Sequence, residues 1–153
     1  MKTNGLPRNL RLIRTEDFGV LLKASRKDTI YVSNSCFSAH ALIVKNDIRL
    51  RMGVTVGKKN APRSVDRALV KRILREAFRK KASILMNDLQ TLGLGLDVSL
   101  RLRIPLKQLS AHSQGVTAMK AVLGDEANDV VKKLLRHITK MKSSDLRCPK
   151  RNV

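Results

Sequence analysis

The chain has 153 residues, a length that suits one domain with a modest core. Its 32 Lys and Arg against 12 Asp and Glu give a formal charge of +20, so the folded chain repels itself and a polyanionic partner is expected, nucleic acid being the usual one for a basic domain. No stretch approaches the roughly 20 apolar residues of a membrane span, and the basic start lacks the apolar core of a secretory signal, so we expect a cytoplasmic protein with no membrane partner.

The N-terminal segment is predicted to be a basic arm followed by a short helix. Residues 1–14 carry four Lys or Arg without a buried-face pattern. A helix is predicted from about Thr15, which can cap it, with Glu16 and Asp17 in the first turn, where carboxylates suit the helix dipole. This helix would present Phe18 together with two leucines.

Three strands are predicted to follow. The first two are TIYVS, residues 29–33, and FSAHALIVK, residues 37–45, which are rich in residues that favour strands. After a turn at Asn46 and Asp47, residues 48–56 alternate between apolar side chains and Arg or Thr. Residues 37–56 are therefore predicted to form a strand, a turn and a further strand.

A strongly basic helix is predicted next, from about Ser64 to Lys81, with an extension as far as Leu89 left open. Four cations recur every four residues, namely Arg67, Lys71, Arg75 and Arg79. Together with Arg72 they fall within one arc of about 140°. The other side is apolar and is expected to pack on the sheet, with Phe78 near the boundary; it comprises Val65, Leu69, Val70, Ile73, Leu74 and Ala77.

Two interpretations of the basic arc are open: an ordinary solvated face, or a binding surface for phosphates. A solvated helix usually mixes the signs of its charges, whereas here three successive i,i+4 pairs are all positive, each costing roughly 0.2–0.5 kcal/mol. That repulsion becomes favourable when phosphates occupy the arc and release their counterions. The pattern therefore favours phosphate binding.

After the Gly-containing TLGLGL, a fourth strand is predicted over residues 96–105, with Arg101 and Arg103 on its polar side. Residues 107–124 show no clear pattern, and a closing amphipathic helix is predicted from about Glu126 to Lys142. We therefore predict one RNA-binding domain over residues 15–142, between the basic arm and a basic disordered tail, residues 143–153.

No motif for catalysis by the chain itself is present in the sequence. The Gly53 to Lys59 stretch faintly resembles a phosphate-binding loop of nucleotide hydrolases, but it is short by one residue and Lys59 stands where Ser or Thr must hold magnesium. The carboxylates are scattered, unlike those of a magnesium nuclease, and the Cys and His residues have no metal-ligand spacing. We expect no catalytic and no metal-binding residue.

The segment MGVTVGKKNAPRSVDRALVKRILREAFR resembles the most recognisable motif of the bacterial ribonuclease P protein component. That motif is a Lys-Lys strand end followed by a helix with an Arg-Asn-Arg sequence and an Arg-Glu-x-Phe-Arg end. The resemblance extends in order and kind over residues 8–142. The chain departs from the motif at Ala68 and Leu69, where the family has Asn and Arg, and at Gly57, where it has Ser.

The resemblance implies an α+β fold of the ribosomal protein S5 domain 2-like type: a four-stranded sheet with packed helices in the order α-β-β-β-α-β-α. It also implies a left-handed β-α-β crossover around the basic helix, an exception to the usual right-handed rule.

The resemblance further implies a subunit of an endoribonuclease that removes the 5′ leader of precursor tRNA. In such a holoenzyme the RNA subunit is catalytic and binds most of the magnesium, and no protein partner is required. The implied partners are thus the catalytic RNA and precursor tRNA. The residues expected to contact the catalytic RNA through phosphates are Lys58, Lys59, Arg63, Arg67, Lys71, Arg72, Arg75 and Arg79.

The single-stranded leader is expected on the sheet and the first helix, where aromatic rings stack on bases and cations meet the backbone. The residues expected there are Phe18, His40, Arg49, Arg51, Arg101 and Arg103. A general RNA-binding or ribosomal protein without a processing role is the alternative, because its charge and element order would be similar. A DNA-binding module ranks third, since no helix-turn-helix pairing is visible.

Overall fold

The structure is a computed structural model that describes residues 29–45, 47–109 and 115–147, with only the backbone for 116 and 142–147. In chain order its elements are β1 (Thr29–Ser33), β2 (Phe37–Lys45), β3 (Leu50–Thr55), α2 (Ser64–Leu92), β4 (Leu94–Leu102), the short 3-10 helix η3 (Leu106–Gln108) and α3 (Val116–Arg147). The predicted first helix, with Phe18, and the basic arm lie outside the described residues.

The four strands form one mixed sheet in the order β1-β2-β4-β3. β1 and β4 both pair antiparallel with β2, whereas β3 pairs parallel with β4. The register places Tyr31 opposite His40, His40 opposite Ser99, and Ser99 opposite Gly53. Because side chains alternate across a strand, these four residues share one face of the sheet.

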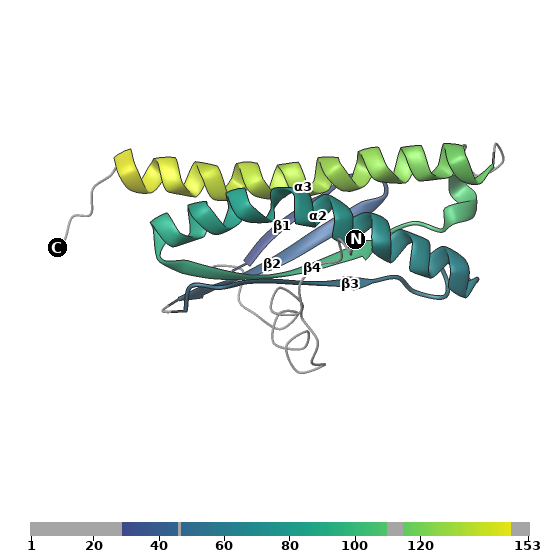
Figure 1. Ribbon diagram of the computed structural model, residues 1–153, viewed down its shortest axis with the longest axis horizontal. Coiled ribbons are helices and arrows are strands. Elements are labelled where there is room, and N and C mark those ends of the chain that lie inside the picture. Colours follow the sequence, from purple (N-terminus) through teal and green to yellow (C-terminus); the bar gives the residue numbers. More distant parts are fainter. Residues whose placement is uncertain (1–28, 46, 110–114, 148–153) are drawn as a thin grey trace, which may run out of the picture.

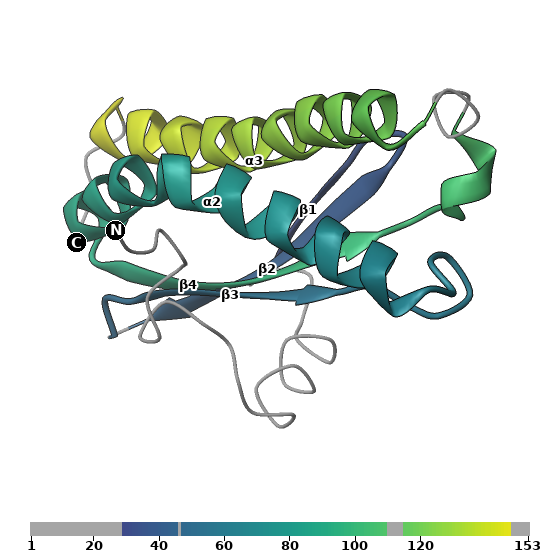
Figure 2. The same ribbon diagram turned by 45° about the vertical axis from the view of Figure 1, so that its right-hand side comes forward.

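The two described helices cover the other face of the sheet (Figures 1 and 2). The residues between them and the sheet form the core, in which Phe37, Phe78 and Leu74 are fully buried. No described helix lies on the face that carries His40 and Ser99, and we call this the second face. The predicted α+β class with a four-stranded sheet is confirmed.

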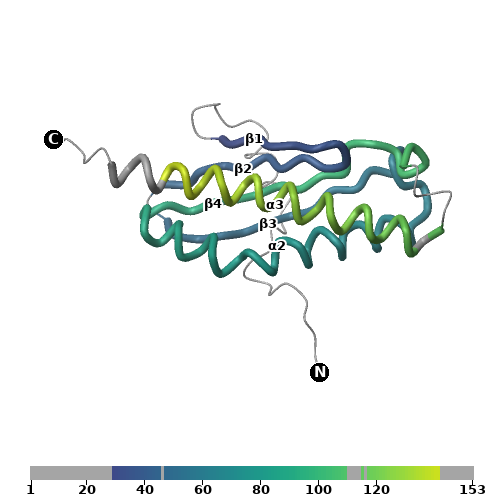
Figure 3. The backbone as a smooth tube through the Cα atoms, turned by 90° about the horizontal axis from the view of Figure 1, so that it is seen from above, coloured from purple at the N-terminus to yellow at the C-terminus, as the bar shows by residue number. Residues whose placement is uncertain are grey.

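The connection from β3 through α2 to β4 has the unusual hand. β3 and β4 are parallel neighbours, and α2, which connects them in the chain, runs in the opposite direction on the helix-covered side. Seen from that side with both strands pointing upward, β4 lies to the left of β3 (Figure 3). The crossover is therefore left-handed, as the family resemblance implies and against the general rule.

α2 extends beyond the predicted range of Ser64 to Lys81, past the possible end at Leu89, and is capped by a glycine. Gly93 adopts a left-handed conformation, φ 71°, and its N–H caps the last carbonyls of the helix. The predicted phase is largely right, since Val70, Leu74 and Phe78 are buried, but Val65 is 66% exposed. At 100° per residue Val65 lies on the opposite side of the helix from Leu74, so the apolar face was predicted too wide.

α3 begins earlier and ends later than predicted. The expected start was near Glu126, whereas the helix starts at Val116, because Met119 and Leu123 continue its buried stripe toward the N-terminus. Gly124 interrupts the helical pattern in the sequence but not the helix. At the other end the helix continues to Arg147, within the segment predicted as a disordered tail.

Candidate nucleic-acid interface

The basic arc of α2 lies on the side of the helix that the core leaves uncovered. Lys71, Arg75 and Arg79 are partly exposed and Arg72 is exposed, whereas Leu74 between them is fully buried. The helix is anchored by its apolar stripe, so the cations are carried on a rigid element. This arrangement presents a line of positively charged side chains that are spaced about one helical turn apart.

Arg79 and Arg67 also make contacts within the chain. Arg79 forms an ion pair with Glu76 on the preceding turn, and hydrogen bonding from Arg79 lowers the pKa of the Glu76 carboxyl. Arg67 donates from Nη1 to the carbonyl oxygens of Ala61, at 3.0 Å, and Pro62, at 2.8 Å. Arg67 therefore also fixes the loop that precedes α2.

That loop, residues 57–63, carries three more predicted cations. Lys58, Lys59 and Arg63 are all exposed, and Arg63 lies 4.0 Å from Asp66 across the start of the helix. The loop is held to the end of β4 because Asn60 donates from Nδ2 to the Leu102 carbonyl at 3.1 Å. Cations at this position extend the basic arc past the helix N-terminus, where backbone N–H groups also attract anions.

A groove of about 620 Å³ lies on the second face of the sheet and reaches this loop. We call it the sheet groove; its described lining residues are Tyr31, Ser38, His40, Thr55, Gly57, Asn60, Ser99, Arg101, Leu102 and Arg103. Because Gly57 and Asn60 line the groove and Lys58 and Lys59 stand between them in the chain, the groove and the basic arc adjoin at one loop.

Two rings and two arginines give the sheet groove its chemistry. Tyr31 is 60% exposed, and its ring meets that of His40 edge to face with centroids 6.2 Å apart. Arg101 and Arg103 are exposed at the end of β4, where Arg103 also donates to the Asn34 carbonyl. Exposed rings beside cations are the combination that binds single-stranded nucleic acid.

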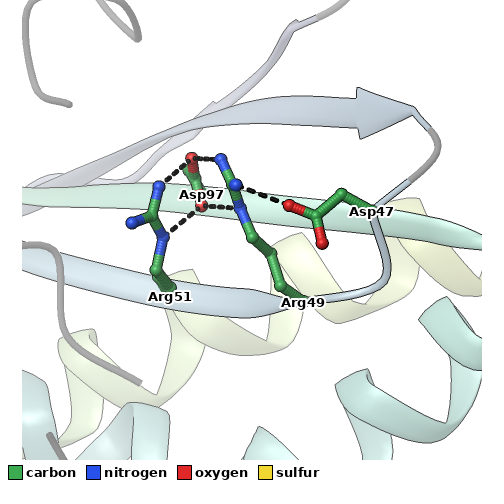
Figure 4. A network of polar contacts seen from close by, with 4 residues as sticks. All are labelled: Asp47, Arg49, Arg51 and Asp97. Carbon is green, nitrogen blue, oxygen red and sulfur yellow. Dashed lines mark hydrogen bonds and ion pairs between the residues drawn. The ribbon is translucent and has the colours of Figure 1, made fainter. Parts of the chain in front are cut away.

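The two remaining predicted leader residues, Arg49 and Arg51, are held in a separate polar network (Figure 4). Both donate twice to the buried Asp97: Arg49 at 3.2 and 2.7 Å, and Arg51 at 3.1 and 2.9 Å. Arg49 also donates to Asp47 at 2.7 Å. Since Arg51 is opposite Asp97 in the register, the network lies on the second face, nearer the other end of β4.

The network shifts the pKa values of Asp97 and Arg49. Burial alone would raise the pKa of the Asp97 carboxyl, but the hydrogen bonds and charges of Arg51 and Arg49 outweigh it and lower this pKa below its usual range. Hydrogen bonding to Asp97 raises the pKa of Arg49. The two arginines therefore hold one carboxylate, and they are less available to phosphates than Arg101 or Arg103.

The structure thus groups most predicted residues on two adjoining surfaces and separates Arg49 and Arg51 from them. Sequence reasoning did not identify Tyr31, Ser38 or Ser99 as residues of the groove. Only the strand register places them there, although the alternation in the β1 segment was a usable signal for the exposure of Tyr31.

The described residues contain neither a cluster of metal ligands nor a membrane-spanning helix. Within residues 29–45, 47–109 and 115–147, no three His, Cys, Asp or Glu side chains gather where they could hold a metal ion. No helix in the same part of the chain is long and apolar enough to cross a membrane.

A basic α+β domain with an arginine-lined groove and a cationic helix has the features typical of a nucleic-acid-binding protein. The family model of ribonuclease P matches residues 6–125. The chain therefore belongs to the ribonuclease P protein family.

Individual relatives agree with this assignment. The ribonuclease P protein component of Paraburkholderia xenovorans is 28% identical over 144 residues, 94% of each chain. That of Thioalkalivibrio sulfidiphilus is 38% identical over 77 residues, 50% of this chain and 59% of that one.

Solved structures show the same fold. The RNase P protein of Staphylococcus aureus matches with a TM-score of 0.58 and 22% identity, covering 82% of this chain and 94% of that one. The RNase P protein of Thermotoga maritima matches with a TM-score of 0.54 and 20% identity, covering 80% and 96%.

Proposed function

We propose that this chain is the protein subunit of ribonuclease P that binds the catalytic RNA through α2 and its preceding loop, and the 5′ leader of precursor tRNA in the sheet groove. The observation that carries the proposal is the two-sided α2. One side is buried in the core, and the other carries a line of cations that adjoins the groove.

The contact with the catalytic RNA would be made through phosphates. The helix contributes Lys71, Arg72 and Arg75 to this contact, and the preceding loop adds Lys58 and Lys59 beyond the helix N-terminus. Phosphate contacts fix position and orientation without reading sequence. They would therefore hold the protein in one place on a large folded RNA.

The leader would lie across the second face of the sheet. Bases can stack on the exposed ring of Tyr31 or on His40, while Arg101 and Arg103 meet the backbone. Because the groove and the basic arc share the loop 57–63, a leader in the groove would run next to the bound catalytic RNA. The magnesium that assists cleavage would be held mainly by the RNA subunit, and the chain would contribute binding and position.

A charge reversal on the arc tests this proposal. Lys71→Glu replaces a phosphate contact by repulsion, so affinity for the catalytic RNA should fall at least tenfold. The fold should not suffer, because Glu at this position gains i,i+4 pairs with Arg67 and Arg75, and the melting temperature should hold or rise slightly. Affinity is measured by filter binding and stability by thermal unfolding monitored by circular dichroism.

Lys120→Glu is the matched control, since it makes the same change in charge at an exposed position of α3. It should weaken RNA binding by much less. Equal losses for the two variants would show that net charge alone drives binding, and the proposed role of α2 would then be wrong.

A further inference from the structure

A second line of cations runs along the outer face of α3. Lys132, Arg136 and Lys140 are exposed and follow one another at i,i+4 spacing, so they fall within an arc of about 80°. We call these three residues the α3 stripe. The buried stripe of α3, which includes Val130 and Leu134, faces the sheet, so the α3 stripe points away from it.

The α3 stripe has no partner within the described part of the chain: none of its three side chains makes a hydrogen bond or an ion pair there. The adjacent Lys133 shows what a structural cation looks like on this helix. Its Nζ lies 3.0 Å from the Ser33 carbonyl and 3.6 Å from Asp129. The stripe is therefore not explained by contacts that stabilise the fold.

Two ordinary explanations of such a stripe do not fit it. A solvated helix face usually carries mixed charges, but the pairs 132–136 and 136–140 are both positive and each costs roughly 0.2–0.5 kcal/mol. The helix dipole favours cations only within the last turn, whereas Lys132 lies about four turns before Arg147. The repulsion in the stripe is relieved when an anion binds.

The surface between α2 and α3 connects the α3 stripe with the basic arc. A groove of about 320 Å³ there is lined by Arg72 and Lys80 of α2 and, on the α3 side, by Gly124 and Asn128, one turn before Lys132. One carboxylate, Glu76, also lines it, but it is paired with Arg79. Positive charge thus continues from α2 toward the α3 stripe.

We propose that the α3 stripe is a second phosphate-binding surface for the catalytic RNA, an inference that rests on the proposed function. The helices cover one side of the sheet (Figure 1), and the residues that line the sheet groove lie on the other. A precursor tRNA whose leader lies in the sheet groove would be on the side of the sheet away from α3. An RNA bound on α2 can instead extend across the groove between α2 and α3 to the α3 stripe. The occupant is therefore the catalytic RNA and not the precursor tRNA.

The test is the double variant Lys132→Gln and Arg136→Gln, compared with the control Lys107→Gln and Lys120→Gln, which removes the same charge at two exposed positions elsewhere. The stripe variant should bind the catalytic RNA about tenfold more weakly. Its plot of log K against log salt should be shallower by roughly 1.4–1.8, because two phosphate contacts are lost. In the control variant, the change in affinity and the change in salt slope should each be at most about a third of the change in the stripe variant.

Three results would overturn the inference. Equal effects of the two doubles would show a response to net charge, an unchanged affinity of the stripe variant would show that α3 does not touch the RNA, and a loss confined to precursor tRNA binding by the assembled complex would assign the stripe to the substrate. Lys71→Glu is measured alongside. If wild type binds and Lys71→Glu does not, an unaffected stripe variant refutes this inference alone; if wild type fails to bind, the proposed function itself fails.

Discussion

Asp97 shows how a single residue decides what two predicted binding residues do. Its side chain is 4% exposed and accepts both Arg49 and Arg51 in two-pronged contacts. An ion pair so far from solvent is strong only because each oxygen is hydrogen-bonded. The arginines consequently hold β3 to β4 near Asp47.

Asp97→Asn should lower the free energy of unfolding at pH 7 by about 1–3 kcal/mol. The charge-assisted hydrogen bonds are lost, and Arg49 and Arg51 no longer have a carboxylate between them. The pKa of Asp97 is lower in the folded state than in the unfolded state. The stability that this carboxylate contributes is therefore fully present above the unfolded-state pKa, about 4, and is lost as the pH falls through the lower folded-state pKa. Urea unfolding at pH 7 and pH 3 should show the difference between variant and wild type shrinking in acid. A difference independent of pH would show that the carboxylate charge does not matter.

Ala68 offers a test by gain of binding. It is exposed on α2 near the basic arc, at a position where the family motif has Asn. Ala68→Arg should add one phosphate contact, so the affinity for the catalytic RNA should rise and the salt plot should steepen by roughly 0.7–0.9. Repulsion from Arg72 should cost the free protein about 0.2–0.5 kcal/mol. Thr91→Arg, at the far end of the same helix, should not steepen the plot; if it does so equally, the position of the charge is irrelevant.

At the scale of elements, two glycines at helices should respond in opposite directions to alanine. Gly124 lies inside α3, and a Cβ there would meet nothing within 4 Å, so Gly124→Ala should raise the free energy of unfolding by about 0.5–1 kcal/mol. Gly93 caps α2 with a positive φ, so Gly93→Ala should lower it by about 1 kcal/mol. Both are measured by urea unfolding, and a destabilised Gly124→Ala would mean that α3 is not a continuous helix at this point.

The sequence predicted elements better than it predicted their ends and their neighbours. β1 and β2 have the predicted bounds, because alternation and turn residues mark both. The start of α3 was missed because Gly124 and the unpatterned residues before it hide a stripe that only packing on the sheet reveals.

The candidate site was predictable where it depends on one helix and not where it depends on pairing between strands. The arc of α2 follows from its period of 3.6 residues. The contacts of Arg51 with Asp97, and of Tyr31 with His40, depend on strand register. β3 and β4 are far apart in sequence and give no local signal of their register, whereas the register of β1 and β2 is set by the short loop between them.

At the scale of the whole molecule, the sheet separates two surfaces. The helices cover one side (Figures 1 and 2), and the residues that line the sheet groove lie on the other. The basic arc of α2 meets the groove at the loop that carries Lys58 and Lys59. In the proposed function, this arrangement lets a chain with a net charge of +20 contact the catalytic RNA and the leader together.

The most direct test of this account is cleavage of precursor tRNA by the catalytic RNA of a related ribonuclease P at low magnesium, with and without this chain. Phosphate contacts from the chain should replace part of the neutralisation that magnesium otherwise supplies. We predict that the folded wild-type chain raises the cleavage rate at least tenfold and that Lys71→Glu does not. A folded wild-type chain that binds the RNA but leaves cleavage unchanged would contradict the account and would favour a general RNA-binding protein.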